Sequence, residues 1–160
     1  MKRHTSALGV ALVVFLAVLG LVGSVVAGEQ VPFRGRLEGS FIVTPVSPTL
    51  LSVVITGTGN ATQLGGFALT VPHSVDLTTN VATGLYQFTA ANGDTLVAMF
   101  SGQATPVTPE ILHIVETATI IGGTGRFANA TGAFTGDRLI DLVTSTTSGS
   151  FDGTISTNEE

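Results

Sequence analysis

The chain of 160 residues contains no cysteine, and charged residues make up only 11% of it. Without cysteine there are no disulfide bonds, no thiolate metal sites and no lipid-modified cysteine anchor. The formal net charge of −5 and the scarcity of basic residues argue against nucleic acid as a partner, because phosphate binding requires clustered Lys and Arg.

The N-terminal residues 1–27 have the pattern of a secretory signal peptide. Lys2 and Arg3 precede an apolar run that starts at Ala7 and ends in small residues at Ala27. This order predicts cleavage after residue 27 and secretion of the remaining chain. An uncleaved anchor is the alternative, since the run approaches the roughly 20 apolar residues that span a bilayer. Contact with a membrane is expected only through this segment.

The remaining residues, 28–160, are expected to form a single domain with one core. Without Lys2 and Arg3, this part has four basic residues, all Arg, against eleven acidic ones, which gives a net charge of −7. Abundant Thr, Val and Ile together with 20 Gly favour strands joined by tight turns. No apolar repeat with the helical period of 3.6 residues is found after residue 28.

Alternating apolar residues and turn signals predict eight strands. Pro45 and Pro48 are expected to end the first strand and Pro72 the third, with His73 in a polar connector. Gly57–Asn60 and Asn92-Gly93 are expected to form turns. The expected strands cover residues 31–44, 50–58, 62–71, 83–91, 95–104, 110–121, 133–144 and 148–156.

Eight short strands at hairpin spacing predict a closed antiparallel β-barrel, with a β-sandwich as the alternative. A barrel of eight strands is either filled by its side chains or leaves room for one small ligand. We expect a lumen that serves as a ligand site to hold an open cavity of roughly 300 Å³ or more.

A glycine-rich segment follows the most strand-like run of the chain. Gly122, Gly123 and Gly125 predict a tight reversal, and Gly132 predicts a bulge or a close backbone approach. The segment resembles that of the allene oxide cyclase and dirigent-protein barrel superfamily. There, a Gly-Gly-Thr/Ser-Gly-basic-Phe run is followed by an Ala, one further residue and a Gly.

From Val31 onward, the chain resembles the small secreted bacterial branch of this superfamily. The resemblance implies an eight-stranded antiparallel barrel, often a homotrimer, with an apolar lumen in which plant relatives orient a reactive lipid or phenolic intermediate. The catalytic residues of the plant cyclase do not transfer, because they include a cysteine that this chain lacks. The resemblance therefore predicts the fold more firmly than an activity.

Two charged residues interrupt strand faces that are otherwise apolar. Glu116 lies between Ile114 and Ala118, and Arg138 precedes Ile140 on the next strand. A buried carboxylate must be paired or protonated, and the hairpin allows Glu116 and Arg138 to meet. This pair is the candidate catalytic site. The alternative is a buried ion pair with a structural role.

No cofactor and no metal are expected, since His73 and His113 lie on different elements without a third ligand at metal spacing. The main hypothesis is a secreted noncatalytic barrel that binds a small apolar ligand or serves as an extracellular structural module. The alternative is an isomerase- or cyclase-like or dirigent-like enzyme. In that case the barrel orients a reactive intermediate, and Glu116 and Arg138 stabilise developing charge.

Overall fold

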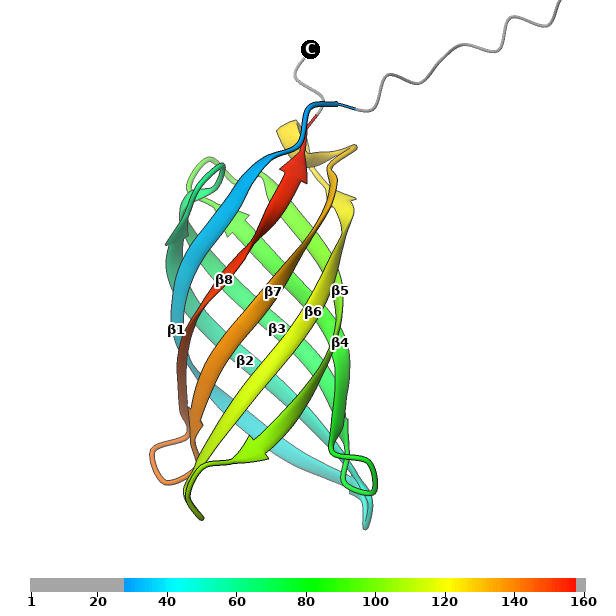
Figure 1. Cartoon of the computed structure of the whole chain (residues 1–160), viewed down its shortest axis with the longest axis vertical. Helices are drawn as coiled ribbons and strands as arrows, with labels where there is room; N and C mark the ends of the chain where they lie inside the picture. The colour runs from blue at the N-terminus through cyan, green and yellow to red at the C-terminus, as the bar shows by residue number, and fades with distance from the viewer. Residues whose placement is uncertain (1–27, 158–160) are drawn as a thin grey trace, which may run out of the picture.

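The computed structural model describes residues 28–157, and the expected signal peptide lies outside the described residues. The described chain is a closed antiparallel barrel in which eight strands follow one another in sequence order and the last pairs with the first (Figure 1). The predicted eight-stranded barrel is confirmed, and its closure rules out the alternative β-sandwich. No helix among these residues is long and apolar enough to cross a membrane.

The strands are long, and their hairpins are short. A 3₁₀ turn, η1 (Gly125–Phe127), lies between the sixth and seventh strands. The strands are β1 (Val31–Ser47), β2 (Leu50–Ala61), β3 (Gly65–Asp76), β4 (Val81–Ala90), β5 (Thr95–Pro106), β6 (Ile111–Gly123), β7 (Thr131–Asp141) and β8 (Thr146–Ser156).

The prediction that prolines end these strands is wrong for Pro45 and Pro72, whereas Pro48 directly follows the end of β1. Pro45 lies inside β1 and pairs with Leu51. β1 pairs with β8 only as far as Ser40, so the missing N–H of Pro45 removes no hydrogen bond on that side. Pro72 lies inside β3, at a position that the β3–β4 register skips. Both prolines occupy gaps in the ladder that the sequence pattern does not reveal.

The turn expected at Gly57–Asn60 is also wrong, because these residues belong to β2. A Cβ atom on Gly57 would lie 2.2 Å from the carbonyl oxygen of Glu38, so glycine serves a close approach of β1 and β2. The chain reverses at residues 62–64, where Gln63 has a φ of 66°. The Asn92-Gly93 turn is confirmed, with a φ of 89° at Gly93.

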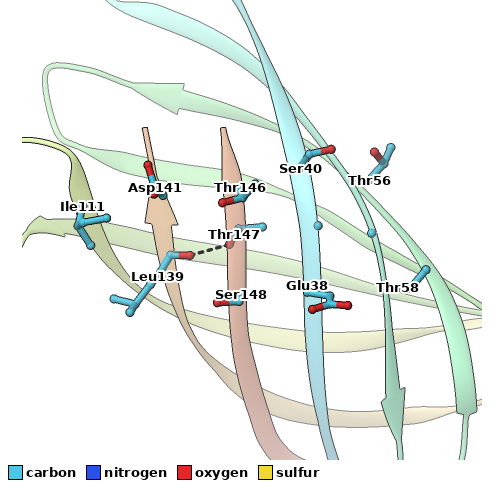
Figure 2. A pocket seen from close by; sticks show the side chains of 12 residues that line it. Glu38, Ser40, Thr56, Thr58, Ile111, Leu139, Asp141, Thr146, Thr147 and Ser148 are labelled. Atoms are coloured by element: carbon cyan, nitrogen blue, oxygen red, sulfur yellow. Dashed lines mark hydrogen bonds between the residues drawn. The ribbon is translucent and has the colours of Figure 1, made fainter. Parts of the chain in front are cut away.

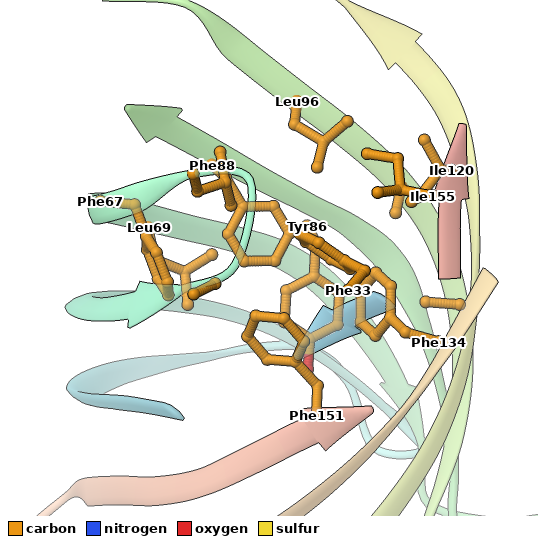
Figure 3. Packing of buried hydrophobic residues seen from close by; sticks show 14 of the residues in the cluster. Phe33, Phe67, Leu69, Tyr86, Phe88, Leu96, Ile120, Phe134, Phe151 and Ile155 are labelled. Carbon is orange, nitrogen blue, oxygen red and sulfur yellow. The ribbon is translucent and has the colours of Figure 1, made fainter. Parts of the chain in front are cut away.

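Aromatic rings fill one half of the barrel, toward the end at which β1 begins and β8 ends (Figures 1 and 3). Phe88 is fully buried and has ring centroids between 5.2 and 6.2 Å from those of its aromatic neighbours. Phe127, on η1, is buried in the same cluster. The rings that pack together are Phe33, Phe67, Tyr86, Phe88, Phe134 and Phe151.

Candidate functional site

The opposite half of the barrel contains a cavity of about 190 Å³. Aliphatic side chains such as Val53, Ile55 and Ile114 form its wall. The exposed residues Leu77 and Leu142, from the loops after β3 and β7, also line it, so the cavity reaches the barrel end. It is smaller than the expected 300 Å³, yet this half of the lumen is not filled by its own side chains.

The inner end of the cavity is formed by the two charged residues singled out in the sequence. Glu116 on β6 and Arg138 on β7 line the cavity and are 1% and 2% exposed. Arg138 binds the carboxylate with two nitrogens: Nη2 donates to Oε1 at 2.5 Å, and Nε donates to Oε2 at 3.1 Å. The structure thus brings the two candidate residues together in a bidentate ion pair, which is the strongest geometry for these groups.

Two further residues that the sequence analysis missed complete this cluster. The hydroxyl of Tyr86 on β4 donates to Oε2 of Glu116. Nη1 of Arg138 donates to Oγ1 of Thr147 on β8 at 2.9 Å, and that hydroxyl donates to the carbonyl oxygen of Leu139. The sequence did contain a signal for Tyr86: it is the only tyrosine of the chain, and it occupies an inward position of its strand, where its hydroxyl needs a partner. Glu116, Arg138, Tyr86 and Thr147 are called the polar cluster below.

Glycines on the neighbouring strands make room for the polar cluster. Gly102 pairs with Glu116, and a Cβ atom there would lie 2.4 Å from its Cγ. A Cβ on Gly136 would lie 3.2 Å from Oε2 of Glu116, and one on Gly149 would lie 2.7 Å from Cγ of Arg138. The large polar side chains fit inside a narrow barrel because the positions beside them have no side chain.

Burial determines the charge states in the polar cluster. It raises the pKa of Tyr86 far above the ordinary value, against the influence of the Arg138 charge, so the phenol is neutral. Burial by itself would lower the pKa of Arg138, but Tyr86 and Glu116 outweigh it and raise that pKa. Arg138 is therefore charged. Together with the carboxylate that it binds, it forms a pair without net charge.

His73 lies in β3 and lines the cavity, so its predicted place in a connector is wrong. Its ring is 5.7 Å from that of Phe100, and its Nδ1 lies 3.0 Å from the carbonyl oxygen of Val71. Burial lowers the pKa of His73, so the imidazole is neutral near pH 7. The adjacent Gly84, on β4, leaves the space that the histidine side chain occupies.

The four glycines of the glycine-rich segment lie at the closed, aromatic end and do not touch the cavity. Gly122 and Gly123 are the last residues of β6, and the reversal runs from residue 124 to 130. Gly125 has a φ of +56°, and a Cβ there would collide with the carboxylate of Asp94. At Gly132, with a φ of +147°, a Cβ would lie 2.2 Å from the carbonyl oxygen of Thr154.

A larger hollow, of about 700 Å³, lies on the outer wall of the barrel across β7, β8, β1 and β2 (Figure 2). Its surface consists mainly of short hydroxyl side chains, with the carboxylates of Glu38 and Asp141 at separate positions. Within residues 28–157, no three His, Cys, Asp or Glu side chains are grouped to hold a metal ion. We take the inner cavity as the candidate site because it lies inside the barrel, is apolar and ends at the polar cluster.

The first prediction concerns the ion pair. Glu116→Gln should lower the free energy of unfolding by about 3–5 kcal/mol, because it leaves the Arg138 charge buried without a counter-charge. Chemical denaturation measures this loss. Asp152→Asn is the control: it breaks the exposed Arg34–Asp152 pair and should cost less than about 1 kcal/mol. Equal losses in the two variants would contradict a structural role for the buried pair.

The second prediction concerns Tyr86. Ultraviolet titration of the folded protein should show no phenolate at the ordinary tyrosine pKa of about 10. Since the pKa is higher in the folded than in the unfolded chain, stability is fully present below about pH 10 and falls as the pH rises above it. Phenolate should therefore form only as the barrel unfolds, as followed by circular dichroism. Ionisation near pH 10 with the fold retained would show that the phenol is not held in the polar cluster.

No protein-family model and no curated protein match the chain. Two similar solved structures are the pterocarpan synthase dirigent proteins GePTS1 and PsPTS1. GePTS1 is 13% identical, with a TM-score of 0.60 over 93% of this chain and 98% of its own. PsPTS1 is 12% identical, with a TM-score of 0.60 over 82% of this chain and 97% of its own. Both of these structural neighbours are dirigent proteins, and the likeness shows that the chain shares their barrel fold.

Proposed function

We propose that the barrel binds a small, neutral and mainly apolar molecule in the inner cavity and acts without catalysis. The observation that carries this proposal is an apolar cavity that opens at one barrel end and stops at a polar cluster whose two charges are already paired. A lumen that served only the stability of the fold would be packed at both ends, as it is in the aromatic half.

The volume of the cavity limits what it can enclose. A buried apolar cavity of about 150 Å³ takes up benzene in other proteins, whereas pockets for drug-sized ligands start at about 300 Å³. The 190 Å³ found here suits one ring or a short alkyl chain. A longer ligand would place the rest of its length in the mouth, beside exposed apolar residues such as Leu77 and Leu142.

The charges at the inner end favour a neutral ligand. Glu116 and Arg138 neutralise each other, and burial keeps His73 uncharged near pH 7. An anionic ligand would lose its hydration and meet the carboxylate of Glu116. A cationic ligand would lose its hydration and meet Arg138. Neither would gain a free counter-charge to offset the cost of desolvation.

The geometry of Glu116 supports the noncatalytic reading. Oε1 accepts from Arg138, and Oε2 accepts from both Arg138 and Tyr86. A general base needs a free lone pair within reach of the substrate proton. Three of the four lone pairs of the Glu116 carboxylate accept these hydrogen bonds, and protonation would leave the Arg138 charge buried without a counter-charge, which makes Glu116 a poor base.

Orientation of a reactive intermediate in the lumen is the second candidate function. It is favoured by the similarity in fold to two pterocarpan synthase dirigent proteins. In this case Arg138 would stabilise charge that develops on the intermediate. We rank this function second because the cavity encloses no more than about one ring and because Glu116 is held in a buried ion pair.

Secretion is part of the proposal, because Lys2, Arg3 and the apolar run after them have the order of a signal peptide. A homotrimer, which the resemblance implies, stays a prediction. Native mass spectrometry of protein recovered from culture medium would give both the mature N-terminus and the subunit count.

Filling the cavity tests the proposed function. The probe is n-propylbenzene, and its binding is followed by NMR titration. Ala104→Phe places a ring in the cavity that Ala104 lines and should weaken binding at least tenfold, because probe and side chain compete for one space. The control, Ala68→Phe, adds the same ring at an exposed position of β3 and should bind as the unchanged protein does. Absence of binding to the unchanged protein, or equal binding by both variants, would contradict the proposal.

A further inference from the structure

His73 presents a hydrogen-bond acceptor to the inner cavity. Its Nδ1 lies 3.0 Å from the carbonyl oxygen of Val71, and a carbonyl can only accept, so Nδ1 carries the ring proton and donates it. In a neutral imidazole the other nitrogen then has a free lone pair. The backbone of β3 thus fixes the tautomer that makes Nε2 an acceptor.

Within residues 28–157, every fully buried side-chain nitrogen or oxygen has a hydrogen-bond partner. Nε2 of His73 has no partner among these residues, so it is not fully buried. Nε2 is therefore open to a molecule of the size of water. Since His73 lines the cavity, we take the space that Nε2 meets to be the cavity itself. A ligand that fills this space without a donor would leave the acceptor unpaired, at a cost in affinity.

Arg138 adds donors at the same end of the cavity. Its guanidinium has five N–H groups, and three of them bind Glu116 and Thr147. The N–H groups that remain belong to a side chain that lines the cavity. The inner end thus combines one acceptor with charge-assisted donors that the polar cluster does not use.

We propose that His73 determines the specificity of the cavity by accepting a hydrogen bond from the hydroxyl group of a neutral alcohol. This inference rests on the proposed function and names the polar group of the ligand. A hydroxyl can donate to Nε2 of His73, and its oxygen keeps lone pairs that can accept from a donor such as Arg138. A carboxylate cannot donate to His73, and its charge would face Glu116.

Two probes of the same shape test this inference. 2-Phenylethanol and n-propylbenzene differ only in a terminal hydroxyl in place of a methyl group. His73→Leu removes the acceptor and should weaken the binding of 2-phenylethanol about tenfold, with n-propylbenzene changed less than threefold. His113→Leu makes the same substitution in the other described histidine, whose Nε2 bonds to Asp137 and which does not line the cavity. This variant should leave the dissociation constants of both probes unchanged.

If His73→Leu weakens the binding of both probes equally, or of neither, the role of His73 is overturned and the proposed function stays in place. Failure of both probes to bind the unchanged protein would overturn both. A measurement that needs no variant is the ¹⁵N resonance of Nε2 in the unchanged protein. It should move upfield with 2-phenylethanol and stay in place with n-propylbenzene, and equal movement with both would also overturn the inference.

Discussion

The buried ion pair between Glu116 and Arg138 is the constraint on which the interior of the barrel depends. Two ions removed from water lose several kcal/mol of hydration each, which only close contact and further hydrogen bonds can offset. Here the guanidinium binds the carboxylate through two nitrogens, Tyr86 donates to the carboxylate, and Thr147 accepts from the guanidinium. Four strands, β4, β6, β7 and β8, supply these groups, and because β4 and β8 lie on opposite sides of the ring, the cluster links the walls of the barrel across its lumen.

The polar cluster separates two interiors of different character. On one side, aromatic rings pack edge to face and tilted, and with Phe127 they fill the closed end. On the other side, aliphatic residues line a cavity that is left open. Inward glycines such as Gly102 and Gly149 accommodate the cluster at the boundary. The barrel thus has one end packed with aromatic side chains and one hollow end lined by aliphatic side chains.

Much of the fold can be predicted from this sequence, because strand alternation and turn glycines are local signals. The barrel, the number of strands and the Asn92-Gly93 hairpin follow from them. Glu116 and Arg138 stood out because a charge on an apolar face is visible in the sequence, and the structure pairs them. Tyr86 and His73 were missed because an aromatic residue inside a strand resembles core, and because Pro72 suggested a strand end. Their positions depend on gaps in the hydrogen-bond pattern of the sheet and on glycines of neighbouring strands. Both features become visible only in the folded barrel.

The account depends most on the claim that the half of the barrel beyond the polar cluster is hollow and apolar. A crystal structure of the protein under xenon pressure tests this directly, because xenon enters dry apolar cavities of this size. The account predicts xenon inside the barrel between Ile55 and Ile114, on the side of Glu116 away from the aromatic rings. A barrel without xenon in that space, its side chains closed over the cavity, would contradict both the cavity and the ligand that we assign to it.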